Sequence, residues 1–236
     1  MNPSTTQPMN AETRRKILVW IRGAFLGLLG YAAIVLVSAG RWDWLWGWIY
    51  IGLTAVVLAS HVFVLVPVNP ALLASRSEGL AGTKWWDRGL VLLMGICLLA
   101  IMIVAGLDAR FGWSGEVALG VHLAGILIFS AGWALFLWAM ASNPFFSESV
   151  RIQPGHQVAA SGPYHFIRHP GYAGACVYFL AQPLVFGSWW AFIPALLAVA
   201  CYILRTSLED RTLQNELPGY LDYAGLVRFR LMPYIW

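Results

Sequence analysis

The chain has 236 residues, of which 59% are hydrophobic and only 11% are charged. A soluble domain carries charge on about a quarter of its residues, and one with this composition would leave too much apolar surface in water. The composition therefore excludes an ordinary soluble protein and predicts an integral membrane protein. The net charge of +4 is too modest to indicate a nucleic-acid partner.

The first elements in chain order are a polar tail and four apolar runs. The tail, residues 1–16, ends in the basic cluster Arg14-Arg15-Lys16 and has no apolar core with a cleavage site, so we interpret it as a mature tail and not a signal peptide. The region 17–140 is predicted to form four transmembrane helices, since each run is close to the roughly 20 residues that a span needs. These runs are Ile17–Ala39, Trp44–Val66, Gly89–Gly106 and Val117–Met140.

The last part of the chain, residues 141–236, alternates between polar and apolar stretches. A polar break at about 141–171 precedes the apolar run Tyr172–Leu204, which is too long for one comfortable span. The sequence GSWW at 187–190 divides this run and is typical of a turn at a membrane surface. We therefore predict a long helical hairpin over Tyr172–Leu204. The predicted fold class is an all-α integral membrane protein with about five transmembrane helical elements.

Basic residues are distributed unevenly over the loops between these helices. If the N-terminus is cytoplasmic, all the basic residues except Arg41 and Arg110 fall on the cytoplasmic side, as the positive-inside rule requires. This predicts cytoplasmic N- and C-termini in a bacterial-type inner or plasma membrane, or in an ER-type membrane. The polar break and the C-terminal tail are then on the same side, where we place the candidate active site.

Two histidines, His61 and His122, fall inside the apolar runs. An ionisable residue within a membrane is a functional candidate by default. A neutral histidine that is hydrogen-bonded to a helix neighbour is nevertheless cheap to bury, and we favour this second interpretation.

The polar break contains five Gly or Pro residues before the sequence RHPGY at 168–172, together with three histidines and two arginines. Gly and Pro at this density specify a fixed, non-helical path. Such backbone is tolerated near a bilayer only when it is buried in protein or lines a cavity, and a plain connector could be far shorter. We therefore predict a ligand-binding loop in preference to a structural linker.

The C-terminal segment begins where the last apolar run ends. Arg205 and Glu209 are four residues apart and share one helix face. An exposed pair of this kind contributes little to stability, whereas its position at the mouth of the bundle favours a site. Pro218 and Gly219 are expected to end this helix.

Three motifs of this region together resemble a known family. They are GPYHFIRHPGYAG at 162–174, LEDRTLQNELPGYLDY at 208–223 and VRFRLMP at 227–233. In this order they resemble the C-terminal signature of the isoprenylcysteine carboxyl methyltransferase (ICMT) family, with which phospholipid methyltransferases share features. The resemblance covers about residues 130–236. The chain departs from the family in reading Glu209-Asp210 where two glutamates are usual, and the GxG element of phospholipid N-methyltransferases is absent upstream.

The resemblance implies a membrane-embedded methyltransferase that uses S-adenosyl-L-methionine as methyl donor. It implies Arg205 and Glu209 as catalytic residues. The implied partners are a lipophilic small-molecule or lipidated acceptor, such as an isoprenylcysteine carboxylate or another small lipid, and membrane lipids; no metal and no nucleic acid are expected. The implied cofactor-binding residues are His156, Val158, Gly162, Pro163, Tyr164, Arg168, His169, Pro170, Tyr172 and Asp210.

The chemistry of these side chains agrees with that assignment. Arg168 offers a planar fork suited to the carboxylate of the donor, and Tyr164 and Tyr172 offer aromatic faces to its adenine or sulfonium. Glu209 could pair with the amine of the donor or fix Arg205. Arg205 is expected to hold an anionic group of the acceptor beside the methyl group.

Two other functions stay open at this point. The closing RLMPYIW also resembles the end of sterol reductases, so an NADPH-dependent membrane reductase is the main alternative; Arg151 and Arg168 are the loop cations available to its 2′-phosphate. The other is a non-catalytic lipid-binding or channel subunit, which predicts charged residues along the spans. Between Gly89 and Met140, however, the charges collect in the connecting loop.

Overall fold

A computed structural model describes residues 10–76, 83–147 and 149–236. Every regular element in these ranges is a helix, which confirms the all-α fold class. The first nine residues of the predicted polar tail lie outside the described residues.

The N-terminal half consists of two long helices and a set of short ones. Helix α1 (Ala11–Ala39) begins six residues before the predicted span, because the Asn10 side chain caps it by accepting from the Thr13 N–H at 2.7 Å. Helix α2 (Leu45–Ser60) continues through the π-helical turn η1 (His61–Leu65) into α3 (Val66–Val68). Asn69 then caps the short helix α4 (Pro70–Ser75).

The next two helices are α5 (Trp85–Phe111) and α6 (Leu119–Ser142). The polar break that follows contains one helical turn, η3 (Gly162–His165). Helices α7 (Pro170–Phe186) and α8 (Phe192–Glu216) then form the predicted hairpin, and a left-handed Gly187 (φ 71°) ends α7 within the GSWW sequence. The short helix α9 (Tyr220–Leu226) completes the chain.

The last helix continues beyond the apolar run that ends at Leu204. Helix α8 ends at Glu216, just before Pro218 and Gly219, where its end was expected. Its polar residues Arg205, Thr206 and Asp210 are buried, so they face protein and not solvent. The apolar run therefore covers only the first part of α8, and Pro218 and Gly219 mark its end.

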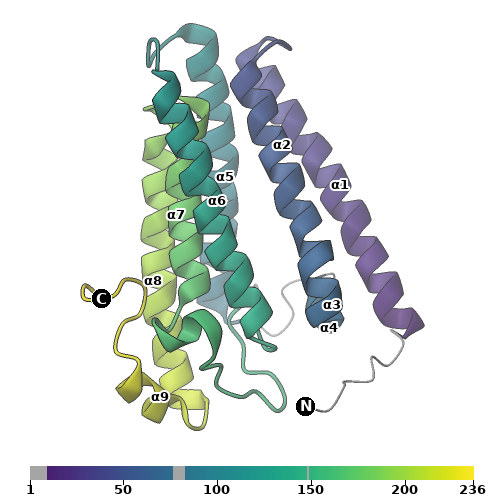
Figure 1. Ribbon diagram of the computed structural model, residues 1–236, viewed down its shortest axis with the longest axis vertical. Coiled ribbons are helices and arrows are strands. Elements are labelled where there is room, and N and C mark those ends of the chain that lie inside the picture. The colour runs from purple at the N-terminus through teal and green to yellow at the C-terminus, as the bar shows by residue number, and fades with distance from the viewer. Residues whose placement is uncertain (1–9, 77–82, 148) are drawn as a thin grey trace.

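The long helices alternate in direction, and this places the connecting segments at two ends of the bundle (Figure 1). The described residues 69–76, 83–84, 143–147, 149–169 and 217–229 lie at the end that we call the loop end. The short turns 40–44, 112–118 and 187–191 lie at the opposite end. The two polar stretches predicted to share one side of the membrane are thus at one end of the fold.

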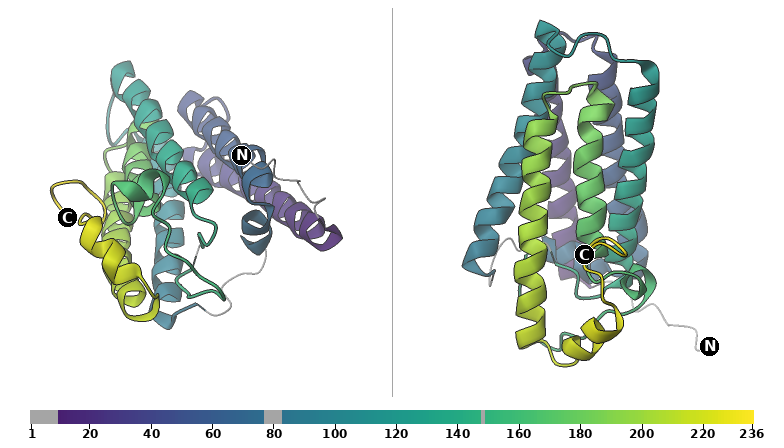
Figure 2. Two further views of the ribbon diagram at one scale, coloured as in Figure 1. Left: turned by 60° about the horizontal axis from the view of Figure 1, so that its bottom comes forward. Right: turned by 90° about the vertical axis from the view of Figure 1, so that its left-hand side faces the viewer.

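Five helices of the described residues are long and apolar enough to cross a membrane. They are Ala11–Ala39, Leu45–Val68, Trp85–Phe111, Leu119–Ser142 and Phe192–Glu216. Helix α7 has 17 residues and packs between α6 and α8 in the bundle (Figure 2). The chain is an integral membrane protein.

Helices α6 and α7 approach each other closely because glycines face one another. A Cβ on Gly132 would lie 2.7 Å from the Tyr178 nitrogen, and one on Gly174 would lie 2.6 Å from the Gly132 oxygen. Both distances are too short for any side chain, so backbone packs on backbone here, as small residues permit in membrane helices. This contact fixes the start of α7, where the RHPGY sequence lies, against α6.

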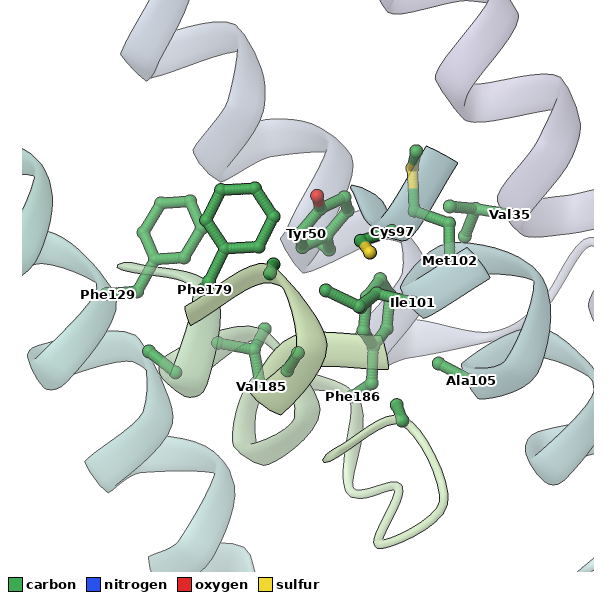
Figure 3. Close-up of a cluster of buried hydrophobic side chains, with 14 of the residues drawn as sticks. Val35, Tyr50, Cys97, Ile101, Met102, Ala105, Phe129, Phe179, Val185 and Phe186 are labelled. Atoms are coloured by element: carbon green, nitrogen blue, oxygen red, sulfur yellow. The ribbon is translucent and has the colours of Figure 1, made fainter. Parts of the chain in front are cut away.

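The main apolar core joins both halves of the chain between the two ends (Figure 3). At its centre, the buried Tyr50 hydroxyl donates to the Gln182 side chain at 2.8 Å and so links α2 to α7. The residues drawn around it come from α1, α5, α6 and α7: Val35, Cys97, Ile101, Met102, Ala105, Phe129, Phe179, Val185 and Phe186.

The two intramembrane histidines fit the favoured interpretation. His61 Nδ1 lies 3.0 Å from the Val57 carbonyl, and His122 Nδ1 lies 2.9 Å from the Val185 carbonyl. The His122 ring also stacks on Trp46 at 3.7 Å between centroids. Each is a buried histidine with a backbone partner.

Candidate active site

A cavity opens at the loop end, between the polar break and helices α7, α8 and α9. Its volume is about 730 Å³, part of which is open to solvent. We call it the loop cavity. Seven of the predicted site residues line it: His156, Val158, Tyr164, Arg168, His169, Tyr172 and Glu209.

Asp210 does not line the loop cavity but lies beneath it, with a side chain only 1% exposed. Arg168 donates to both of its oxygens, from Nε at 2.8 Å and from Nη2 at 2.9 Å. Arg230 Nε (2.8 Å), the Tyr220 hydroxyl (3.0 Å) and Gln214 Nε2 (2.8 Å) donate to the same carboxylate. The Asp210 carboxylate therefore joins the three sequence motifs. It positions Arg168 and Tyr220, which line the cavity.

Arg168 lines the loop cavity, but its fork is directed mainly at protein. Its Nη1 donates to the carbonyls of Val227 (2.9 Å) and Arg228 (3.0 Å), in addition to the two bonds to Asp210. The structure therefore differs from the expectation that this fork is presented to a carboxylate of a ligand. The cause is the C-terminal tail, which folds back so that Phe229 O accepts from the Arg168 N–H at 2.9 Å.

Three of the selected residues lie beside the loop cavity without lining it. Gly162 has a positive φ of 59°, and a Cβ there would clash with the Ser142 side chain. Pro163 lies buried in η3, and Pro170 is the first residue of α7, where proline is favoured. In this geometry they fix the path of the loop.

Tyr172 and Glu209 line the loop cavity, and Arg205 packs against Tyr172. The buried Tyr172 hydroxyl donates to Glu209 Oε2. The Arg205 guanidinium lies over the Tyr172 ring, with its Cζ 4.9 Å from the ring centroid. Arg205 and Glu209 are thus connected through a tyrosine that lies between them.

Arg205 also forms an ion pair with Asp87, which the sequence reasoning did not select. Arg205 Nε lies 2.6 Å from Asp87 Oδ1, and both side chains are almost completely buried. Asp87 lies in the first turn of α5, far from α8 in sequence. The signal in the sequence is a carboxylate directly before the apolar run Gly89–Gly106, because a charge buried at such a position requires a partner.

A second cavity, of about 810 Å³, lies among α5, α6, α7 and α8. We call it the bundle cavity. Its lining is apolar except for a few groups that include Arg205 at one end, and it shares Phe146, Ser147 and Tyr172 with the loop cavity. The exposed Gly95 of α5 also lines it, so the cavity reaches the outer surface of the bundle there. The two cavities meet at Tyr172.

His156 has an unsatisfied group at the loop cavity. Its Nδ1 is buried and has no hydrogen-bond partner within the described part of the chain, and its ring stacks on Phe145 at 4.8 Å. Burial lowers the pKa of His156 below its ordinary value of 6.5, and the nearby Glu209 carboxylate partly opposes this shift. The histidine is therefore neutral at pH 7.

Two other lining residues of the loop cavity, Tyr164 and Tyr223, are held as neutral phenols. The Tyr223 hydroxyl donates to the Tyr164 carbonyl at 2.7 Å, and the Asn143 amide donates to the Tyr164 hydroxyl at 3.4 Å. Burial raises the pKa of both tyrosines above the ordinary value. Their rings supply apolar and aromatic surface to the cavity.

The sequence model of the isoprenylcysteine carboxyl methyltransferase (ICMT) family matches residues 123–215. This range includes most of α6, the polar break, α7 and nearly all of α8, so it carries most walls of the loop cavity. The match confirms the resemblance indicated by the motifs and, with the membrane-spanning helices, supports a membrane methyltransferase in general. A comparison with curated protein sequences finds no match.

Proposed function

We propose, from the ICMT-family region at residues 123–215, that this membrane protein is an S-adenosyl-L-methionine-dependent methyltransferase acting on a lipophilic acceptor. The observation that carries the proposal is the meeting of two different cavities at Tyr172. The loop cavity is polar and aromatic and opens at the loop end, whereas the bundle cavity is mainly apolar and lies among the helices. A reaction between a water-soluble donor and a lipid needs such a junction.

The residues of the loop cavity fit the chemical groups of the proposed donor. The bound donor supplies a methyl group on a cationic sulfur. Glu209 brings a carboxylate, and Tyr164 and Tyr172 bring ring faces that can stabilise a cation. The unpartnered Nδ1 of His156 is available for a polar atom of the donor, and since this histidine is neutral it does not repel the sulfonium.

The bundle cavity fits an apolar chain that ends in an anionic group. Arg205 is the cation in its lining, and Asp87 and the Tyr172 ring hold that cation in place. This favours a lipophilic acid, such as an isoprenylcysteine carboxylate, as the acceptor. A neutral lipophilic thiol would bring no anionic group to Arg205, whereas a phospholipid amine would bring its phosphate.

Alignment is the main contribution that these residues can make to methyl transfer. The transfer is an in-line displacement, and holding the two reactants in line can supply about 7–11 kcal/mol in the best cases. Tyr172 touches both cavities, and its hydroxyl is fixed by Glu209. It is therefore placed to set the angle between donor and acceptor.

The proposal is tested by incubating membranes that contain the protein with a donor carrying a labelled methyl group, and by identifying the fraction that gains the label. We expect the label in a lipid or lipidated-peptide fraction as a base-labile ester. Label in water-soluble acceptors alone would refute the lipophilic acceptor. Calorimetry on the purified protein supplies a second arm, in which saturable binding of NADPH without binding of the methyl donor would favour the reductase.

Arg205→Ala separates the two binding events. Turnover should collapse, because the acceptor loses its anchor, while donor affinity stays within about threefold of wild type, since Arg205 does not line the loop cavity. Turnover is measured by label transfer and donor affinity by calorimetry. Equal losses of both quantities would contradict the role assigned to Arg205.

A further inference from the structure

We propose that Asp87 is a positioning residue. Its one carboxylate fixes both the Arg205 guanidinium in the bundle cavity and the wall of the loop cavity at Val150. This inference rests on the proposed function. Asp87 belongs to α5 and lies outside the residues that match the family model. Through Arg205 and Val150 it connects the N-terminal half of the chain to both cavities.

The two oxygens of Asp87 accept hydrogen bonds from Arg205 and from Val150. Oδ1 lies 2.6 Å from Arg205 Nε, and Oδ2 accepts from Arg205 Nη2 at 3.2 Å. Oδ2 also accepts from the Val150 N–H at 2.7 Å. The Asp87 side chain is fully buried, so these bonds are formed away from water, where the carboxylate and the guanidinium each depend on the other.

The Val150 contact connects this ion pair to the loop cavity. Val150 is 4% exposed and lines that cavity with its neighbours Ser149 and Arg151. Its carbonyl accepts from the Lys84 N–H at 3.3 Å, so the segment is paired to the start of α5 on both its N–H and its C=O. A shift of the Asp87 carboxylate would therefore move Arg205 in the bundle cavity and the 149–151 wall of the loop cavity together.

The start of α5 is a suitable place for this carboxylate. Asp87 lies in the first helical turn, where the helix dipole stabilises a negative charge. Lys84 also pairs with Glu216 at 2.7 Å, which fastens the same helix start to the end of α8. This outer pair is exposed, so it holds the helices together without reaching either cavity.

The test compares Asp87→Asn with two variants, one that changes the contact of Asp87 with Arg205 and one that removes its contact with Val150. Asp87→Asn keeps the shape and removes the charge, and it should raise both the KM for the acceptor and the Kd for the donor by roughly tenfold or more. Arg205→Lys should raise the acceptor KM and leave the donor Kd near wild type. Val150→Pro, which removes the N–H, should raise the donor Kd and leave the acceptor KM near wild type.

These readouts distinguish positioning from a purely structural role. A variant that only misfolds lowers the active fraction, and hence Vmax, while its remaining molecules keep the wild-type KM and Kd. Asp87→Glu, which retains the charge, should recover part of the lost donor affinity. Glu216→Gln, which breaks only the exposed pair, should leave both constants near wild type and serves as the matched control.

An Asp87→Asn protein with wild-type acceptor KM and wild-type donor Kd would overturn the inference. The same result follows if Asp87→Asn changes one constant alone, since the proposal requires both. Failure of the proposed function would look different, because then the wild-type protein would neither bind the methyl donor in calorimetry nor transfer its label.

Discussion

Asp210 shows how one side chain can serve a site that it does not touch. Two arginines, a tyrosine and a glutamine donate to it below the loop cavity. Burying so many charges is costly, and the arrangement is stable only while every partner is present. The sequence grouped Asp210 with the cofactor-binding residues, whereas its contacts are those of a residue that positions Arg168 and the C-terminal tail.

Asp210→Ala should destabilise the protein strongly. It leaves the buried Arg168 without its carboxylate, and breaking a buried pair in this way costs about 3–5 kcal/mol. Thermal unfolding in detergent should show a Tm lower by roughly 10 °C. The Glu216→Gln protein is the control, because an exposed pair contributes about 1 kcal/mol or less. A wild-type Tm for Asp210→Ala would contradict the structural importance of this carboxylate.

His156 predicts how donor affinity depends on pH. Burial lowers its pKa below 6.5, so the ring is neutral from pH 8 down to about that value and gains a proton only below it. A protonated ring would repel the sulfonium, and we therefore expect donor affinity contributed by His156 to be lost as the pH falls through its lowered pKa. Folding stability follows the same sign, since the unfolded chain takes up this proton more readily than the folded one.

The measurement is the donor Kd by calorimetry between pH 5 and 8, for wild type and for His156→Gln. The difference between the two proteins isolates this histidine from ionisations of the donor itself. Because Glu209 opposes the lowering of the His156 pKa, Glu209→Gln should move the loss of affinity to lower pH. Parallel profiles for wild type and His156→Gln would rule out a role of this ring in donor binding.

At the scale of elements, α5 is the helix that relates the two cavities. Its first turn carries Asp87, and four of its residues from Val91 to Leu98 line the bundle cavity. Seven residues of helix correspond to about 10 Å. This distance sets the length of apolar chain that can lie along α5 when its anionic end is bound at Arg205. Gly95 lies on this wall, and a Cβ there would have no heavy atom within 4 Å.

Gly95→Leu should therefore shorten the acceptors that the protein can use. The new side chain would displace about three methylene groups of a bound chain, at about 0.8 kcal/mol each, so the KM for long acceptors should rise by at least about tenfold. The KM for short acceptors and the donor Kd should change little. Gly89→Leu is the matched control, since Gly89 lies in the same helix with open space around it and does not line the cavity. Equal effects of both substitutions would contradict the assignment of the acceptor to this cavity.

At the scale of the whole molecule, the alternation of helix direction brings the polar break and the C-terminal tail to one end. The basic residues predict that this end faces the cytoplasm. The fold shows that the two segments lie at the same end of the bundle, and the charge distribution predicts which side of the membrane that end faces.

Single cysteines in a cysteine-free background can test this orientation with a membrane-impermeant thiol reagent. Ser161→Cys and Asp222→Cys should be labelled only from the cytoplasmic side, because both positions are exposed at the loop end. Glu116→Cys, in the turn at the opposite end, should be labelled only from the other side. Labelling of Ser161→Cys and Asp222→Cys from different sides would exclude a shared cavity.

The sequence by itself determined the fold class, the hairpin with its turn at GSWW, and the region of the candidate site. These features follow from local properties, namely apolar run length, turn residues and motif order, which can be seen in neighbouring positions. Pro218 and Gly219 predicted the end of α8. The sequence could not show that Arg205 is buried, because a polar residue in a helix looks the same in sequence whether it is solvated or paired inside the protein.

Only the tertiary structure decided which charged groups are partners. Arg205 pairs with Asp87 across 118 positions of the chain, and Arg168 directs its fork at Asp210 and not at open space. Pairing over such distances depends on how the helices pack, and in particular on the close contact of α6 with α7 and on the tail that folds back on Arg168. Sequence spacing identifies neighbours on one helix face, whereas the partner of a buried charge is set by whichever helix the fold places against it.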